Sequence, residues 1–336
     1  MMSEFEFIES IRRKFSVAKI GDDCAVLPKD SKTDLVITTD LLVEDIDFRL
    51  NWTTPEFLGH KALAVSLSDV AAMGAKPVWA MLSIGIPVRI WKTDFVEKFY
   101  DGWFCLAKKF DVELVGGDVS KTPDKIVIDS IAAGEVKKDK AILRSGAKVG
   151  DFIFVTGKLG GAAAGLKLFE EDFRYESAAK IWQKNLLLKQ LQPFPQVSDG
   201  EFLSENNLAT AMIDLSDGLS SDLAHLCRES KVGAKIFADK IPIDENLRKF
   251  LMQKRESAET RSLENAFSEE LSFALDGGED FELLFTVNPK KKIKYETGLK
   301  NRKFFCIGEV TANVEIVELK SDENATILQP KGFRHF

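Results

Sequence analysis

The decisive stretch of the chain reads Leu35-Val36-Ile37-Thr38-Thr39-Asp40, an apolar, β-branched run that ends in two threonines and an aspartate. β-Branched residues at this density, with acidic residues on both sides, predict a strand over residues 35–39. We therefore expect Asp40 to follow the end of a strand. That position lies at the rim of a sheet, where ligand crevices form.

The association of an apolar run with glycine or hydroxyl residues and an acid recurs along the chain. It is found at Gly21-Asp22-Asp23, Gly116-Gly117-Asp118, Asp214-Leu215-Ser216-Asp217-Gly218 and Gly277-Gly278-Glu279-Asp280. Ionised carboxylates are costly to desolvate, so stability alone does not favour such a set. If the acids converge, hard cations have to hold them together, and Mg²⁺ carrying nucleotide phosphates is the usual occupant.

Asp69 differs from the other acids because it lies within an apolar helical segment. Its neighbours Ser66, Ser68 and Ala71 are small and leave room for an ion. The alternative for Asp69 is an exposed helix residue. For the other motifs the alternative is ordinary turn chemistry, and Asp214 and Asp217 could serve only as helix caps.

Hydrophobic periodicity and turn residues predict two halves that mix strands and helices. In the first half we expect helices over residues 1–20, 54–74 and 93–110 and strands over 35–39, 79–86, 112–115 and 126–133. In the second half we expect strands over 152–155, 211–213, 281–287 and 304–307, with helices after Gly161 and Gly218. The prediction is a mixed α/β (α+β) fold with domains at 1–136 and 151–336 and a polar linker at 137–150.

Composition excludes several classes of protein. The chain has 336 residues, 45% of them hydrophobic, and a formal net charge of −7. The negative charge argues against nucleic-acid binding, and no apolar run is long enough to span a membrane. The acidic N-terminus does not resemble a signal peptide, so we expect a cytoplasmic protein with four reduced, mostly buried cysteines.

A few other residues could contact phosphates or bases. Residues 157–161, Gly-Lys-Leu-Gly-Gly, lack the spacing of a P-loop and are better interpreted as a packing turn. Arg144 could clamp a phosphate or could be a solvated linker residue. Tyr100 could stack on a base or lie at the edge of the core. His60 and His225 have no paired nucleophile.

Taken together, the motifs resemble bacterial thiamine-monophosphate kinases. The resemblance rests on Thr38–Glu44, on Gly59–Ala75 and on the four acidic motifs above, in one order over nearly the whole chain. The wider superfamily, named for aminoimidazole ribonucleotide synthetase, shares the acidic motifs. The resemblance implies a homodimer of two-domain subunits in which the N-terminal mixed sheets pair, and a C-terminal α/β sandwich.

The resemblance also implies a reaction and a set of site residues. The γ-phosphoryl group of ATP would pass directly to thiamine phosphate, giving thiamine diphosphate, the last step of its biosynthesis. The implied Mg²⁺ ligands are Asp22, Asp23, Thr38, Thr39, Asp40, Asp69, Asp118, Asp214 and Asp217, with Asp22 and Asp23 not separable. Catalysis would fall to Asp40, Asp69, Asp118 and Asp214. Contacts to ATP would come from Tyr100, Gly117, Asp118, Arg144 and Ser216. Thiamine contacts would come from Asp47, Glu279 and Phe333.

One departure from the family concerns a thiamine contact. The family often has Gly-Val-His-Phe where this chain has residues 45–48, Asp-Ile-Asp-Phe. An acid at Asp47 changes the hydrogen bonding at that position, although it could favour a cationic thiazolium ring.

The reaction itself needs no general base, because the acceptor is already an anion. The alternatives left open are another ATP-dependent enzyme of the superfamily, a non-catalytic ATP–Mg²⁺-binding regulator and a metal-dependent phosphatase.

Overall fold

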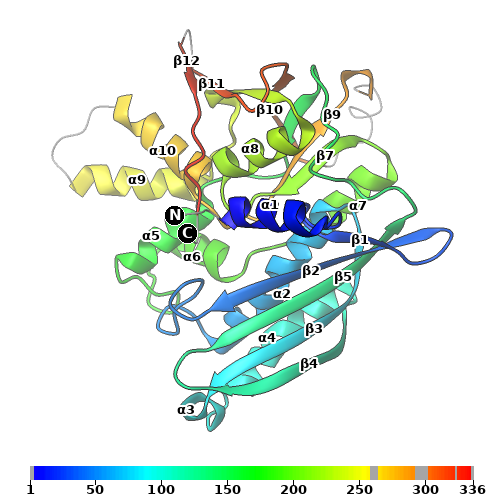
Figure 1. The fold of residues 1–336 in the computed structure, drawn as a ribbon. Coiled ribbons are helices and arrows are strands. Elements are labelled where there is room, and N and C mark those ends of the chain that lie inside the picture. The colour runs from blue at the N-terminus through cyan, green and yellow to red at the C-terminus, as the bar shows by residue number, and fades with distance from the viewer. Residues whose placement is uncertain (1–3, 258–263, 292–301, 322–323, 334–336) are drawn as a thin grey trace.

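The computed structural model describes residues 4–257, 264–291, 302–321 and 324–333. Two β-sheets organise the chain, one built from residues 25–137 and one from residues 152–327 (Figure 1). The expected mixed α/β fold is confirmed, whereas the predicted domain boundaries stay a prediction. None of the described helices is both long and apolar enough to span a membrane.

The N-terminal sheet has five strands in the order β1-β2-β5-β3-β4. All pairs are antiparallel except β3 with β4. The strands are β1 (Ala25–Pro28), β2 (Thr33–Val43), β3 (Lys76–Pro87), β4 (Glu113–Thr122) and β5 (Val127–Lys137). The helices of this half are α1 (Glu4–Phe15), α2 (Pro55–Ala72), α3 (Val88–Trp91) and α4 (Phe95–Phe110). α2 covers one face of the sheet, and we call the other the open face.

The C-terminal sheet has seven strands in the order β12-β11-β8-β10-β6-β9-β7. Its strands are β6 (Phe152–Val155), β7 (Ala209–Asp214), β8 (Gly233–Phe237), β9 (Leu283–Val287), β10 (Phe305–Thr311), β11 (Val317–Ser321) and β12 (Asn324–Ile327). Its helices are α5 (Gly161–Glu170), α6 (Ile181–Leu191), α7 (Val197–Glu205), α8 (Leu219–Ser230), α9 (Glu245–Ser257) and α10 (Glu264–Asp276), with 3₁₀ turns η1 (Ala238–Lys240) and η2 (Pro289–Lys291).

Helix α2 is the central element of the molecule. It begins as expected, with the Thr54 side chain capping the N–H of Phe57 and with Pro55 in the first turn. It packs on the N-terminal sheet, on α4 and on β7 and α7 of the second half. The crossing with α4 is close, because a side chain at Gly59 would collide with the carbonyl oxygen of Phe99. A helix buried on all sides presents functional groups to both halves at once.

The sequence predicted that the acidic motifs at Asp40 and Asp118 follow the ends of strands, and the structure shows that they do not. β2 pairs with β5 from Thr33 to Val43, so Asp40 lies inside the strand. β4 pairs with β3 through Thr122, so Gly117 and Asp118 are also inside a strand. In both cases the neighbouring strand supplies hydrogen-bond partners beyond the glycine or threonines, and pairing continues. Asp214, by contrast, is the last residue of β7, as expected.

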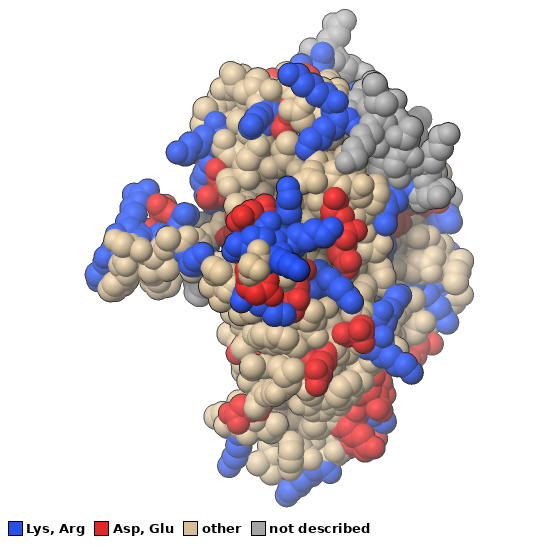
Figure 2. Space-filling view, turned by 90° about the vertical axis from the view of Figure 1, so that its right-hand side faces the viewer, with Lys and Arg blue, Asp and Glu red and all other residues tan. Residues whose placement is uncertain are grey.

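The surface and the cysteines complete the comparison with expectation. On the face shown in Figure 2, lysine and arginine side chains are interspersed with aspartate and glutamate side chains. All four cysteines are free, as expected, but only Cys24 and Cys227 are buried, whereas Cys105 and Cys306 are exposed.

Candidate functional site

The site is built around three polar side chains of the buried core. Ser66 of α2 donates to Asp40 Oδ2 at 2.7 Å, toward the N-terminal sheet. Ser68 donates to Asp214 Oδ2 at 2.6 Å, toward the second half. Thr38 of β2 donates to Asp69 Oδ2 at 2.5 Å. Through Ser66 and Ser68, helix α2 therefore connects Asp40 and Asp214, which are far apart in sequence. From the sequence alone, these two serines are notable only as small neighbours of Asp69.

Three carboxylates from three separate segments meet at this point. Asp23 precedes β1, Asp69 lies on α2 and Asp214 ends β7, and one oxygen atom of each lies within 4.8 Å of the others. We call these three residues the acid cluster. Convergence of Asp23, Asp69 and Asp214 was expected, and the alternatives of an exposed Asp69 and a simple cap at Asp214 are wrong.

Burial and mutual repulsion perturb the acids strongly. Burial, followed by the carboxylate of Asp23, raises the pKa of Asp214 to about 7 and that of Asp22 to about 7. Burial raises the pKa of Asp40 to about 6. Burial, followed by Asp40 and Asp214, raises the pKa of Asp69 well above its ordinary value. Without a cation, this site holds protons that aspartates normally lose near pH 4.

Arg144 is a buried partner of the acids, and its interpretation as a solvated linker residue is wrong. Its side chain is 18% exposed, and its Nη2 lies 2.7 Å from Asp23 Oδ1. Its backbone N–H donates to Asp22 Oδ1 at 2.9 Å. Burial lowers the pKa of Arg144, but Asp23 more than offsets this and the net pKa is raised. The single positive charge of Arg144 faces three carboxylates, so it does not neutralise the whole cluster. In addition, Asp23 Oδ2 is buried without a hydrogen-bond partner.

Two cavities border the acidic residues of this region. The first has a volume of about 1580 Å³ and borders Asp22, Asp23, Thr38, Asp69 and Arg144. Residues of α1 and α8 form its other wall. Because β1 pairs with β2 only as far as Ile37, the cavity reaches round the edge of β2 and also borders Thr39. The second cavity, of about 640 Å³, borders Asp40, the residue that accepts from Ser66 of α2.

The second cavity brings together the three residues assigned to thiamine by resemblance. Asp47, Glu279 and Phe333 all border it, as does Ser216. The carboxylate of Asp47 accepts from the N–H of Val43 at 2.8 Å.

Lys61 of α2 is a buried residue of this cavity that sequence reasoning missed, although it lies within the Gly59–Ala75 motif. Its ammonium lies 2.5 Å from the carboxylate of Glu279, which Gln190 also contacts. The pair links the two halves across the cavity.

Other candidate residues lie outside these cavities. Gly117 and Asp118 are on β4, the edge strand of the N-terminal sheet, with Asp118 exposed. Tyr100 is half-buried on α4 and meets Phe99 edge to face at 5.7 Å. Asp217 is three residues beyond Asp214, in the loop before α8, where its carbonyl accepts from the N–H of Phe333 at 3.1 Å. None of these four described residues borders either cavity within one subunit.

The turn at residues 157–161 is a packing turn, as interpreted from its spacing. The carboxylate of Asp280 accepts from the backbone N–H groups of Gly160 and Ala162, at 2.6 and 3.2 Å. This acid therefore occupies the N-terminus of α5, where a phosphate could otherwise bind. His60 Nε2 lies 2.9 Å from the carbonyl oxygen of Pro193 and is buried away from the acids.

Comparisons with known proteins agree with this geometry. Residues 21–136 match the family described as AIR synthase related protein, N-terminal domain, and residues 148–320 match its C-terminal domain. The thiamine-monophosphate kinase of Bacillus subtilis is 35% identical over 100% of both chains. That of Buchnera aphidicola from Acyrthosiphon pisum is 38% identical over 99% of both.

Solved structures give the same result. A structure of AaThiL complexed with AMPPCP and TMP is 31% identical, with a TM-score of 0.84, and the match covers 100% of this chain and 97% of that one. Hydrogenase maturation protein HypE, 17% identical with a TM-score of 0.67, shares the fold alone. The family resemblance stated from the motifs is confirmed, and the chain belongs to the thiamine-monophosphate kinase family of AIR synthase related proteins.

Proposed function

We propose that the chain transfers the γ-phosphoryl group of ATP to thiamine monophosphate, giving thiamine diphosphate and ADP. The observation that carries the proposal is that one cavity borders Asp23 and Asp69 of the acid cluster, while a second borders Asp40 and Ser216 close to it. The cavity on the Asp69 side is large and borders the cationic Arg144, which suits a nucleotide polyphosphate. The cavity on the Asp40 side borders Asp47 and Glu279, which suit a cationic thiazolium ring.

The residues of the acid cluster fit Mg²⁺. They supply carboxylate oxygens, the ligands that Mg²⁺ prefers, and the unpartnered Oδ2 of Asp23 is a buried acceptor that lacks a donor. We propose that Asp23, Asp69 and Asp214 hold Mg²⁺, with Asp22, Thr38, Thr39, Asp40 and Asp217 as further ligands. Bound Mg²⁺ would neutralise the charge that develops on the transferred phosphoryl group.

The chain's own residues would then position the two substrates. Arg144 would contact the nucleotide phosphates, and Ser216 would lie where the two cavities approach each other. Asp47, Glu279 and Phe333 would orient the thiamine moiety so that its phosphate faces the acid cluster. Because the acceptor is an anion, catalysis would consist of positioning and charge neutralisation, with direct in-line transfer.

We propose further that the chain acts as a homodimer in the cytoplasm. The open face of the N-terminal sheet exposes large apolar residues, including Leu41 at 61% and Met81 at 36%. Exposed apolar surface of this kind commonly marks a protein interface. Tyr100, Gly117 and Asp118 border neither cavity of their own subunit, and pairing of these sheets could bring them to the site of a second copy.

A product assay tests the reaction. The purified chain is incubated with ATP and Mg²⁺ and either thiamine monophosphate or thiamine, and products are identified by mass. Thiamine diphosphate from the monophosphate alone supports the proposal. ADP without thiamine diphosphate would favour another superfamily substrate, free inorganic phosphate would favour a phosphatase, and binding without turnover a regulator. With chiral γ-phosphate, inversion is expected and net retention would contradict direct transfer.

A further inference from the structure

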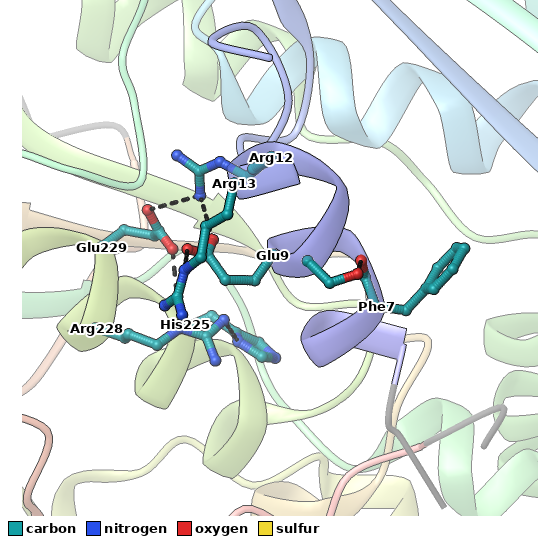
Figure 3. Close-up of polar contacts among 8 residues, drawn as sticks. Phe7, Glu9, Arg12, Arg13, His225, Arg228 and Glu229 are labelled. Atoms are coloured by element: carbon teal, nitrogen blue, oxygen red, sulfur yellow. Dashed lines mark hydrogen bonds and ion pairs between the residues drawn. The ribbon is translucent and has the colours of Figure 1, made fainter. Parts of the chain in front are cut away.

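The wall of the large cavity opposite the acid cluster contains basic residues that no motif singled out. Arg12 and Arg13 come from α1, Arg228 from α8, and Lys19 from the segment that leads to β1. Figure 3 shows Arg12 and Arg13 reaching from α1 toward Glu229 and Arg228 on α8. Glutamates lie on the same wall, namely Glu6, Glu9, Glu229 and Glu315.

Among these basic residues of α1 and α8, Arg12 lies directly beside Gly21 of the loop that carries Asp22 and Asp23. A Cβ atom built on Gly21 would lie 2.8 Å from Nη1 of Arg12, and Gly21 directly precedes Asp22 and Asp23. Gly21 has a φ of +117°, so the loop both requires glycine and leaves room for the guanidinium. Arg12 therefore borders the same cavity as the proposed metal ligands, beside the loop that carries two of them, in reach of an anion held there.

The present partners of Arg12 hold it loosely. Its Nη1 lies 3.3 Å from Glu9 and 3.9 Å from Glu229, and its side chain is 32% exposed. The second separation exceeds a hydrogen-bond distance, so Glu229 attracts Arg12 without fixing it. A phosphate offers shorter, bidentate contacts to a guanidinium than these carboxylates provide. Arg144 is less available, since Asp23 already contacts it at 2.7 Å.

We propose that Arg12, supported by Arg228, binds the phosphates of the nucleoside triphosphate, which makes α1 part of the nucleotide site. The inference rests on the proposed function, whose nucleotide it places in the large cavity. Glu229 holds Arg12 near the cavity until the phosphates replace it. Arg12 thereby supplies positive charge from α1 to the cavity that the acid cluster borders.

The test compares four variants of the full chain. Arg12→Gln removes the charge, Arg12→Lys keeps it without the bidentate fork, and Glu229→Gln removes the competing carboxylate. Lys14→Gln, an exposed residue of the same helix that does not border the cavity, is the matched control. For each, the Kd for AMPPCP with Mg²⁺ is measured by calorimetry, and KM for ATP, KM for thiamine monophosphate and kcat are measured by product assay.

For Arg12→Gln, Kd for AMPPCP and KM for ATP are expected to rise about tenfold, with kcat and KM for thiamine monophosphate within about twofold of wild type. For Arg12→Lys, Kd for AMPPCP and KM for ATP should lie between the values of wild type and Arg12→Gln. Glu229→Gln and Lys14→Gln should bind AMPPCP no more weakly than wild type.

A change below about twofold for Arg12→Gln would overturn the inference. Equal weakening by Glu229→Gln would also overturn it, because the ion pair would then act only by holding α1. If the wild-type chain makes no thiamine diphosphate, the proposed acceptor is wrong, yet Arg12-dependent AMPPCP binding would still support the inference.

Discussion

The two faces of the N-terminal sheet carry similar residues in very different surroundings. On the covered face, Thr38 donates to Asp69, and Asp40 accepts from Ser66 of α2. On the open face, the exposed Thr39 donates to Asp129 Oδ1 at 2.7 Å. Residues that are adjacent in sequence thus have opposite neighbours, because side chains alternate across a strand. The same threonine–aspartate contact lies beside buried, repelling acids on one face and near water on the other.

The largest expected effect comes from the covered face. Asp69→Asn keeps the side-chain size and the contact with Thr38 but removes a charge from the acid cluster. We expect kcat to fall at least ~1000-fold with the fold retained, since metal positioning is lost. The measurement is thiamine diphosphate formation at saturating Mg²⁺, with circular dichroism as the fold check.

Asp111→Asn is the matched control for this substitution. Asp111 caps α4 in a left-handed conformation that asparagine also adopts readily. Normal turnover of Asp69→Asn would refute the metal assignment and remove the distinction between the two faces.

A smaller loss is expected from the open face if it forms the dimer interface. Met81→Glu places a charge in the exposed apolar surface of the open face, so we expect a monomer and a loss of activity of about 20-fold or more. Light scattering after size exclusion gives the mass. Val149→Glu, at an exposed valine outside both sheets, should leave mass and activity unchanged. A fully active monomeric variant would show that each subunit has a complete site.

A matched pair of substitutions compares the faces directly. Thr38→Val removes the hydroxyl that contacts Asp69, and Thr39→Val removes the one that contacts Asp129. We expect a loss in kcat of about tenfold for the first and about threefold at most for the second, because a charge-assisted hydrogen bond is stronger when buried. Steady-state kinetics measure both. Equal losses would mean that the Thr39 hydroxyl on the open face contributes as much to the proposed metal site as the Thr38 hydroxyl on the covered face.

The smallest expected effect is a pH dependence of stability in the absence of metal. Burial raises the pKa of Asp214 in the folded chain to about 7, whereas in the unfolded chain it stays near 3.8. The folded state therefore binds more protons between these values, and its free energy of unfolding falls as pH rises from about 4 to 7. The slope is at most about 1.4 kcal/mol per pH unit for each such group.

Thermal unfolding with and without Mg²⁺ measures this effect. Mg²⁺ replaces the bound protons, so it should raise Tm more at pH 8 than at pH 5.5, and Asp214→Asn should reduce that difference. Asp129→Asn on the open face should not. An equal Mg²⁺ effect at both pH values would contradict the assignment.

Much of this protein could be predicted from local sequence. The caps and periodicity of residues 54–74 predicted α2, and β-branched runs predicted the central strands, because both signals act within a few residues. The acids Asp23, Asp69 and Asp214 could be named as a converging set, because the desolvation cost of a carboxylate makes each of them unusual. The family could be named from the same motifs.

Tertiary structure decided the rest. β2 and β4 continue through Asp40 and Asp118 because strand ends depend on the pairing of neighbouring strands, which are distant in sequence. Arg12 became a candidate only when α1 was placed beside Gly21 and α8. Likewise, the raised pKa of Asp214 depends on burial and on Asp23, which lies far away along the chain. The sequence determined which side chains could act as metal ligands or contact phosphates. Long-range packing decided which of them share one buried, low-dielectric site. The physical reason is that desolvation and charge repulsion depend on the distance between groups in space and not on their separation along the chain.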